Sequence, residues 1–186
     1  MDLWHYRNVL AGLPLGFAFF STRWEWEDGI FPWCAAGLLV AAGIAVRAWS
    51  VCHNRYGRGD KKTLAVTGPY ALVRNPLYWG NMAIIAGAVA ASELAWFLPV
   101  ALIWSFLVYD RAVRREEIRL VRKYGDEWFA YRDAVPRWIP NRVPGLERLS
   151  SSPLLFAKAA TLQAYNGAIL LPFVMKELNL FHLWHA

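Results

Sequence analysis

The chain has 186 residues, is 57% hydrophobic and carries a formal net charge of +6. This hydrophobic share exceeds the roughly 45–50% of soluble domains, and eleven tryptophans are many for the length. Because Trp and Tyr collect where a protein passes from lipid to water, the composition favours an integral membrane protein over a soluble one. Lys and Arg are concentrated within 47–74 and 111–158, which is the positive-inside pattern of a membrane protein and argues against a nucleic-acid partner.

Five largely uncharged segments are predicted to be membrane helices, which need about 20 residues to cross the hydrocarbon core. The first is short and contains Pro14, so we expect it to be kinked. The second and third are rich in Ala and Gly, which let helices approach closely in lipid. Gln163, Asn166 and Pro172 interrupt the fifth. The five segments are residues 8–22, 29–46, 76–92, 94–109 and 159–175.

The connecting segments differ in character. Residues 47–62 are basic and lack apolar periodicity, so they are predicted to form a mobile loop. Thr67 or Gly68 is predicted to cap a helix that Pro76 interrupts. Glu93 marks a tight turn, and residues 140–153 read as a linker.

The fourth apolar segment continues as a charged helix over residues 110–124. Gly125 is expected to end this helix, and Asp126 is expected to cap a second short helix that ends at Pro136. The apolar side chains of the two helices are predicted to lie against the membrane surface, with the arginines in water. They are Ile118, Val121, Tyr124, Trp128 and Tyr131.

The distribution of charge also predicts a topology. Placing the two basic segments inside puts the acidic residues 25–28 and the Glu93 turn outside. With five spans, the N-terminus is then inside and the C-terminus outside. The opening residues lack the basic start and the cleavage signal of a secretory leader, so the first apolar segment is expected to remain as an anchor.

Two polar clusters flank the hairpin formed by the third and fourth spans. Glu116 and Glu117 follow the fourth span, and the segment from Arg74 to Gly80 precedes or opens the third. Each has a purely structural explanation: the glutamates could pair with arginines at helical spacing, and the second cluster could cap a helix. Neither cluster decides the function by itself.

Taken together, their order and spacing resemble the isoprenylcysteine carboxyl methyltransferase and phospholipid methyltransferase family of membrane enzymes. The resemblance covers about the middle 75 residues and rests on five motifs. These read Gly68-Pro69-Tyr70, Arg74-Asn75-Pro76-Leu77-Tyr78-Trp79-Gly80, Glu116-Glu117-Ile118-Arg119-Leu120, Tyr124-Gly125-Asp126-Glu127-Trp128-Phe129-Ala130-Tyr131, and Val135-Pro136 with Pro140.

The chain departs from the family pattern at Asn75, where relatives most often carry His. Asn donates and accepts hydrogen bonds but does not titrate near neutral pH. A cofactor-contacting role survives this exchange, whereas a role as a base does not.

The resemblance implies that the cofactor is S-adenosylmethionine. Glu117 would bind the polar groups of the cofactor, and Leu120 and Tyr124 would pack on its adenine. Other residues would line its adenosine or methionine portion. They are Tyr70, Val73, Asn75, Pro76 and Tyr78. Acidic and aromatic side chains suit the cationic sulfonium of this cofactor.

Methyl transfer is an in-line displacement, so positioning supplies most of the rate. A carboxylate acceptor needs no general base, and Arg74, or secondly Arg137, would orient it. An amine or thiol acceptor needs a proton acceptor, for which Glu116 and Tyr131 are the candidates. We expect the acceptor to be a lipophilic small molecule or a lipid-modified molecule that enters from the membrane lipid.

The resulting expectation is an all-α, polytopic membrane helix bundle of about five transmembrane helices. Residues 1–186 form a single domain, with a catalytic and cofactor-binding core at 67–140 and a C-terminal membrane helix within 153–186. The cofactor pocket lies on the cytoplasmic side, between the loop before the third helix and the helices after the fourth. The inner membrane of a prokaryote is the expected location, and the oligomeric state is left open.

Two alternatives remain. Lys123-Tyr124-Gly125-Asp126-Glu127-Trp128 and the Val135 to Pro140 close also resemble NADPH-dependent sterol reductases, although the Glu116-Glu117 pair and the short chain favour a methyltransferase. A non-enzymatic membrane assembly or transport subunit is the second alternative. No metal site is expected, because His182 and His185 have no accompanying carboxylate or cysteine, and Cys34 and Cys52 lack ligand spacing.

Overall fold

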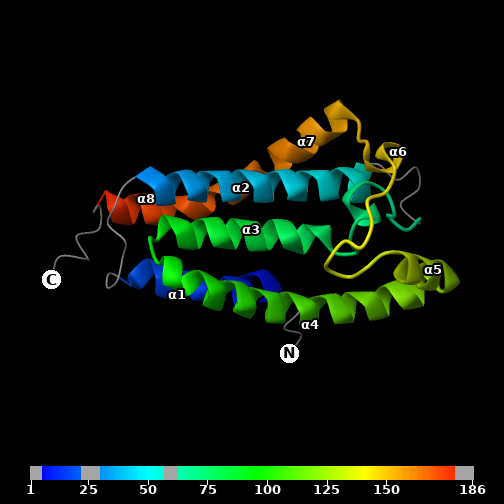
Figure 1. The fold of residues 1–186 in the computed structure, drawn as a ribbon, viewed down its shortest axis with the longest axis horizontal. Helices are drawn as coiled ribbons and strands as arrows, with labels where there is room; N and C mark the ends of the chain where they lie inside the picture. The colour runs from blue at the N-terminus through cyan, green and yellow to red at the C-terminus, as the bar shows by residue number, and fades with distance from the viewer. Residues whose placement is uncertain (1–5, 22–29, 57–62, 179–186) are drawn as a thin grey trace. The chain divides into compact units, whose positions relative to one another are not determined.

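The computed structural model describes residues 6–21, 30–56 and 63–178 (Figure 1). Within these ranges the chain is helical and contains no strand, so the all-α prediction is confirmed. The helices are α1 (Arg7–Phe20), α2 (Ile30–Val51), α3 (Pro76–Ala91), α4 (Leu98–Tyr124), α5 (Asp126–Ala134), α6 (Leu146–Leu149), α7 (Pro153–Gln163) and α8 (Leu171–Glu177).

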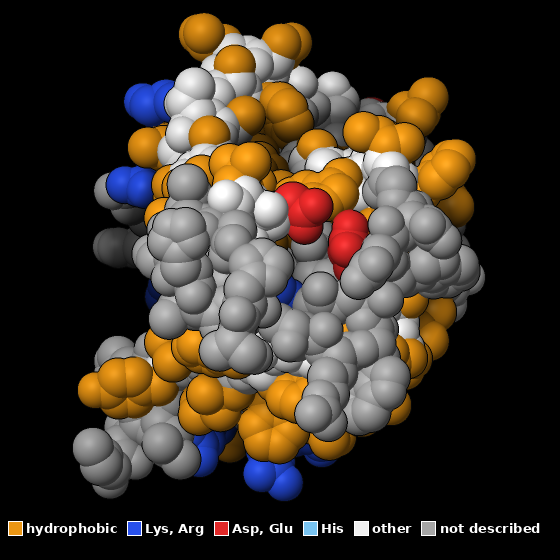
Figure 2. Space-filling model, turned by 90° about the vertical axis from the view of Figure 1, so that its left-hand side faces the viewer, with side chains coloured by type: hydrophobic (Ala, Val, Ile, Leu, Met, Phe, Trp, Pro, Cys, Tyr) orange, Lys and Arg blue, Asp and Glu red, His pale blue; other side chains and the backbone are white. Residues whose placement is uncertain are grey.

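The chain is an integral membrane protein with helices at all five predicted spans. Three continuous helical stretches are long and apolar enough to cross a membrane: Ile30–Tyr56, Ala95–Tyr124 and Pro153–Glu177. Helices α1 and α3 are apolar but shorter. Large apolar side chains such as Phe31 and Ile103 are 80% and 61% exposed, and hydrophobic side chains cover much of the described surface in Figure 2.

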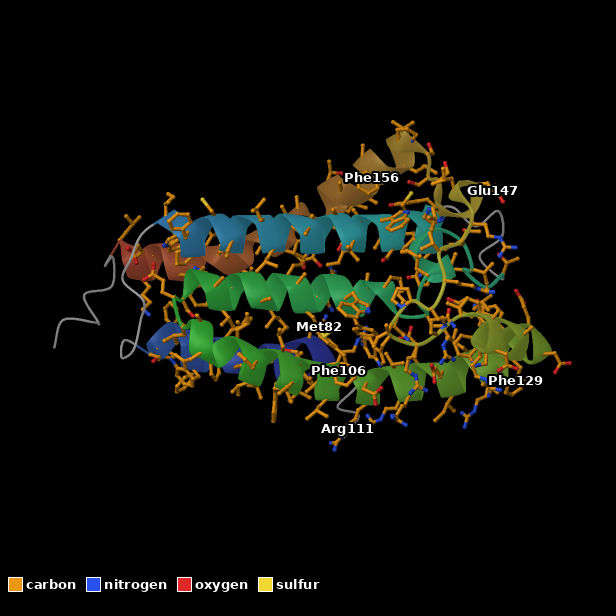
Figure 3. The ribbon with its side chains drawn as sticks, viewed as in Figure 1. Met82, Phe106, Arg111, Phe129, Glu147 and Phe156 are labelled. Atoms are coloured by element: carbon orange, nitrogen blue, oxygen red, sulfur yellow. The ribbon has the colours of Figure 1, made fainter. Side chains whose placement is uncertain are left out.

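Contacts divide the chain into two compact units. The first unit comprises residues 1–43, 81–110 and 166–186, and the second comprises residues 44–80 and 111–165. Helices α2, α3 and α4 contribute residues to both units. Along α4 the outward side chains change from apolar to basic between Phe106 and Arg111 (Figure 3).

In the first unit, α4 satisfies a carbonyl that Pro14 leaves free. Proline has no N–H, so the carbonyl of Leu10, four residues earlier in α1, has no helical donor. The indole Nε1 of Trp104 donates to this oxygen at 2.7 Å, and Ser105 Oγ donates to Ala11 O at 3.1 Å. These bonds explain how a proline is accommodated inside a membrane helix.

Gly87 of α3 packs closely against α2; the sequence predicted close packing of this helix but not its partner. A Cβ built at Gly87 would lie 2.7 Å from Val40 Cγ2 and 2.8 Å from the carbonyl oxygen of Ala36. Only glycine allows the two backbones to lie this close.

The prediction of a loop over 47–62 is wrong for residues 47–56. Helix α2 continues to Val51 and is followed by a π-helical turn, Cys52–Tyr56. Arg47, a basic residue at the start of the predicted loop, is buried within the protein. Its Nε donates a hydrogen bond to Gln163 Oε1 of α7 at 2.9 Å. Ala48 and Cys52 pack on Ala159 of the same helix. The rest of the predicted loop, 57–62, lies outside the described residues.

Three predicted boundaries also change. Thr67 caps only a single 3-10 turn, Gly68–Ala71, and Pro76 opens α3 instead of interrupting an earlier helix. The residue that caps α5 is Gly125, which also ends α4, and its φ of 53° suits glycine. The fifth span begins earlier than predicted, at Pro153, and its middle, Ala164–Leu170, is a 3-10 helix between α7 and α8.

Candidate active site

The second unit brings the two motif clusters together around the carboxylate of Glu117. Arg137 forms a two-pronged pair with it, through Nε to Oε1 at 3.0 Å and Nη2 to Oε2 at 2.5 Å. Arg74 Nη1 lies 3.4 Å from Oε1 on the other side. One carboxylate on α4 is therefore held between arginines from two loops that are distant in the sequence.

The guanidinium of Arg74 is buried and only partly satisfied. Its side chain is 9% exposed, and its Nε and Nη1 have no hydrogen-bond partner. The guanidinium carbon lies 5.7 Å from the centre of the Trp128 ring, in a cation–π contact. Burial lowers the pKa of Arg74, the negative charge of Glu117 opposes this shift, and the nearby positive charge of Arg137 adds to it. An anion placed at these donors would relieve the cost of burying the cation.

Three hydrogen bonds hold the segment after Val135 along the start of α3. Arg74 N donates to Pro136 O at 2.9 Å, and Trp79 Nε1 donates to Trp138 O at 2.9 Å. Asn75 Nδ2 donates to Arg137 O at 3.4 Å, so the residue that replaces the family histidine holds the backbone of an arginine of the cluster. Sequence reasoning placed Trp79 in a motif but missed its contact with Trp138, because nothing in the pattern pairs an indole with a backbone carbonyl so far along the chain.

Glu116 lies next to Glu117 but has a different partner. The hydroxyl of Tyr78, which is buried at the start of α3, donates to Glu116 Oε2 at 3.3 Å. The two neighbouring glutamates thus contact the Arg74–Gly80 segment at two points: Glu117 contacts the guanidinium of Arg74, and Glu116 contacts the phenol of Tyr78.

Tyr131 is buried and has a structural partner. Its hydroxyl donates to the carbonyl oxygen of Tyr70 at 2.8 Å, which fixes α5 against the 3-10 turn. Burial raises the pKa of Tyr131, and Tyr70 adds to this rise. A phenol in this state is a poor proton acceptor, which argues against the base role considered for it.

Trp128 and Tyr131 of α5 face the protein and not a membrane surface, whereas Phe129 of the same helix is 39% exposed. Trp128, Tyr131 and Val135 form a buried cluster. Leu120, Val121 and Tyr124 of α4 pack against it, and Tyr124 also donates its hydroxyl to Thr63 O at 3.4 Å. The prediction that these side chains lie on the membrane surface is wrong for Trp128 and Tyr131, because α5 folds back onto α4. Ile118 remains 54% exposed.

The remaining predicted cofactor residues are Val73 and Pro76, which flank Arg74 and Asn75 in the sequence. Both are buried. Sequence reasoning also missed His53, a buried residue in the π-helical turn after α2. Its Nδ1 lies 3.0 Å from Thr67 Oγ1, and its ring occupies the space where a Cβ on Gly68 would lie. Gly68 has a φ of 62°, so both its conformation and its contact require glycine.

Comparison with known proteins identifies the family. A family model described as phospholipid methyltransferase matches residues 33–127, just over half of the chain, and the chain belongs to this family of membrane methyltransferases. The match includes the Arg74–Gly80 segment and both glutamates of the pair.

Curated relatives carry other names. The nickel-cobalt-cadmium resistance protein NccN of Alcaligenes xylosoxydans xylosoxydans is 30% identical over 62% of this chain and 54% of its own. The cobalt-zinc-cadmium resistance protein CzcN of Cupriavidus metallidurans is 29% identical over 71% and 58%. A Delta(24(24(1)))-sterol reductase of Gibberella zeae is 29% identical over 70% of this chain and 23% of its own. The chain thus spans somewhat over half the length of the first two relatives and about a quarter of the third. No solved structure matches the chain.

Proposed function

We propose that the protein transfers a methyl group from S-adenosylmethionine to a lipophilic acceptor at the Glu117 cluster. The observation that carries this proposal is the meeting of Glu117, Arg74 and Arg137 at one point of the second unit. The donor set fits the cofactor, which bears an ammonium, a carboxylate and a cationic sulfonium. A carboxylate and a buried arginine whose Nε and Nη1 make no hydrogen bond complement these charges.

Glu117 binds the cationic groups of the cofactor, and part of its contact with Arg137 is exchanged for the new one. Leu120 and Tyr124, whose side chains are half-buried beside Trp128, offer the apolar surface for the adenine. Tyr70, Val73, Asn75, Pro76 and Tyr78 line the rest of the cofactor site.

When bound, the cofactor supplies an electrophilic methyl group on its sulfonium. The chain then positions the acceptor in line with that methyl group and excludes water from it. Arg74 orients an acceptor carboxylate through the N–H groups that make no hydrogen bond within the protein, with Arg137 as the second choice. If the acceptor is an amine or a thiol, Glu116 takes the proton, since Tyr131 is committed to Tyr70.

Binding of the cofactor tests this proposal directly. Purified protein in detergent is titrated with S-adenosylmethionine by calorimetry, and Glu117→Gln is expected to weaken binding at least about tenfold, which corresponds to roughly 1.4 kcal/mol. Glu127→Gln, at an exposed position of α5, is the matched control and should bind as the unchanged protein does. Normal affinity in a folded Glu117→Gln protein would exclude the proposed role of this residue.

The acceptor is sought by incubating the protein with methyl-labelled cofactor and a total lipid extract. A labelled product that appears with the unchanged protein but not with Glu117→Gln identifies the acceptor class. Mass spectrometry of that product shows whether oxygen, nitrogen or sulfur carries the methyl group.

Reduction with NADPH is the second candidate, because the sterol reductase of Gibberella zeae is similar over 70% of this chain. The same titration distinguishes the two functions. Tight NADPH binding without binding of S-adenosylmethionine would favour the reductase. The names of the two resistance proteins raise metal handling as a third possibility, yet the described residues contain no group of three or more His, Cys, Asp and Glu that could hold an ion.

A further inference from the structure

The guanidinium of Arg137 occupies the side of Glu117 that a cationic ligand needs. It holds both carboxylate oxygens, through Nε to Oε1 at 3.0 Å and Nη2 to Oε2 at 2.5 Å. Arg74 approaches the same carboxylate, with Nη1 3.4 Å from Oε1. One negative charge thus already faces two positive charges, and a third is repelled while both remain. A cationic ligand must therefore displace one of the arginines to reach Glu117.

Burial decides which of the two arginines leaves. The side chain of Arg74 is 9% exposed and lies against the Trp128 ring, so its guanidinium is enclosed by the protein. The side chain of Arg137 is 28% exposed. A guanidinium at the edge of the site regains its hydration when it moves outward, which lowers the cost of breaking its ion pair. Arg137 is therefore the cation that a ligand displaces.

The backbone of Arg137 is held independently of its guanidinium. The carbonyl groups of residues 136–138 accept three hydrogen bonds from the start of the α3 segment. One of these runs from Asn75 Nδ2 to Arg137 O at 3.4 Å. None of the three uses the side chain of Arg137. The guanidinium can therefore leave Glu117 while the segment that carries it stays in place.

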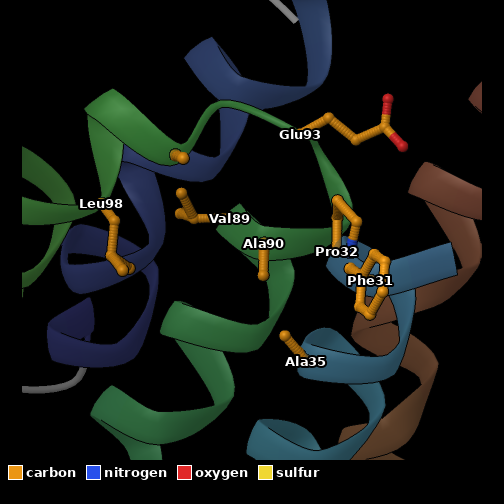
Figure 4. Close-up of a pocket in the computed structure, with 8 residues that line it drawn as sticks. Phe31, Pro32, Ala35, Val89, Ala90, Glu93 and Leu98 are labelled. Atoms are coloured by element: carbon orange, nitrogen blue, oxygen red, sulfur yellow. The ribbon is translucent and has the colours of Figure 1, made fainter. Parts of the chain in front are cut away.

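The polar end of S-adenosylmethionine carries an ammonium and a carboxylate, so its site needs groups of both signs. The Glu117 cluster has both. An apolar cavity of about 630 Å³ in the first unit does not, because Glu93 is the only ionisable residue among its described lining residues (Figure 4). The polar end of the cofactor is therefore best accommodated at Glu117, at the place that Arg137 fills.

We propose that Arg137 is an internal occupant of the ammonium subsite, and that binding of S-adenosylmethionine displaces it. This inference rests on the proposed function and adds a regulation of the same site. A ligand that brings only a cation replaces one ion pair by another. A ligand with a carboxylate as well supplies an acceptor for Nε and Nη1 of Arg74, which make no hydrogen bond within the protein. The contact therefore selects ligands with an intact amino-acid end.

Calorimetric titration of the protein in detergent tests the displacement with two ligands. S-adenosylmethionine carries the ammonium and the carboxylate, whereas methylthioadenosine lacks both. Arg137→Gln is expected to bind S-adenosylmethionine about fivefold more tightly than the unchanged protein, because no partly exposed ion pair has to be broken. Its affinity for methylthioadenosine should stay the same.

Two further variants control for charge and geometry. Arg122→Gln removes an exposed positive charge from α4 and should bind both ligands as the unchanged protein does. Arg137→Lys keeps the charge but not the two-pronged contact. Its affinity for S-adenosylmethionine should lie between those of Arg137→Gln and the unchanged protein.

A second measurement needs no cofactor. Arg137→Ala leaves Glu117 without its two-pronged partner, so a lower thermal unfolding temperature is expected. Methylguanidinium, at concentrations that leave the unchanged protein unaffected, should refill the subsite and restore part of the lost stability. The double variant Glu117→Gln with Arg137→Ala should show no such rescue.

The outcomes separate this inference from the proposed function. If the unchanged protein binds S-adenosylmethionine and Arg137→Gln binds it equally or less tightly, the displacement is refuted while the proposed function stands. Absence of rescue by methylguanidinium in a folded Arg137→Ala protein also refutes the displacement. If neither the unchanged protein nor Arg137→Gln binds S-adenosylmethionine, both proposals fail.

Discussion

At the scale of single residues, the site depends on how buried polar groups find partners. Glu117 satisfies both oxygens through arginines, whereas the nine-tenths buried Arg74 makes no hydrogen bond through Nε or Nη1, and its Nη1 only lies 3.4 Å from Glu117 Oε1 as an ion pair. An uncompensated buried donor costs about 1–3 kcal/mol, and a bound anion removes that cost. The imbalance around Arg74 is the physical reason to place a ligand there, whatever the acceptor proves to be.

Tyr131 gives a prediction for stability and pH. Its pKa is raised by burial, so the folded state holds the phenolic proton more tightly than the unfolded state, whose tyrosines titrate near pH 10. Above about pH 10 the unfolded chain therefore binds fewer protons than the folded one, and stability falls as pH rises. Thermal unfolding temperatures measured from pH 7 to 11 should show this decline in the unchanged protein.

Tyr131→Phe is expected to reduce the alkaline decline. At pH 7 the same variant should be less stable by about 1 kcal/mol, because the bond to the Tyr70 carbonyl is lost. Tyr165→Phe is the matched control, since that tyrosine is 67% exposed. If Tyr131→Phe shows the same alkaline decline as the unchanged protein, another group is responsible for it.

At the scale of helices, close approach of backbones organises the first unit. Gly87 of α3 lies against Ala36 and Val40 of α2, and Trp104 of α4 satisfies the carbonyl that Pro14 frees in α1. Helix association in lipid depends on such packing and hydrogen bonds, because lipid chains are as apolar as the side chains. Close packing at small residues and a hydrogen bond from a tryptophan thus hold these helices together, whereas in water hydrophobic burial would do so.

Gly87→Leu tests the packing of α3 on α2. A Cβ at this position meets Val40 and the backbone oxygen of Ala36 at under 3 Å, so the helices must separate. Overpacking of this kind costs about 1–3 kcal/mol, and a thermal unfolding temperature several degrees lower is expected in one fixed detergent. Gly37→Leu is the control, because a Cβ there meets nothing within 4 Å. Equal stability of the two variants would contradict the packing described.

At the scale of the whole molecule, orientation in the membrane places the Glu117 cluster on one side. The basic residues of 47–74 and 111–158 predict that side to be the cytoplasm, with the Glu93 turn opposite.

Cysteine labelling tests the orientation. In a background with Cys34 and Cys52 replaced by Ala, Ala95→Cys and Ser150→Cys introduce exposed thiols on either side of the predicted membrane. A membrane-impermeant maleimide applied to intact spheroplasts should label Ala95→Cys and leave Ser150→Cys unlabelled until the membrane is opened. Labelling of both variants in intact spheroplasts would refute the predicted topology.

The sequence by itself determined the membrane family and most of the apolar helices, but not the continuation of α2 to Val51 or the short helix α6 within the predicted linker at 140–153. Apolar length and local motifs are properties of neighbouring residues, so Pro76 to Ala91 and the charged continuation of α4 were readable from the chain. The end of α2 was not, because the buried Arg47 has its hydrogen-bond partner, Gln163, on α7, which lies more than a hundred residues away.

The tertiary structure alone decided which partners the polar residues have. Nothing local pairs Glu117 with Arg137, Tyr131 with the Tyr70 carbonyl, or His53 with Thr67. Nor does the sequence show that Trp128 and Tyr131 turn inward, since an apolar stripe is the same whether it meets lipid or α4. A hydropathy pattern shows that one face of a helix avoids water. Only the arrangement of distant segments decides whether that face contacts lipid or another part of the protein.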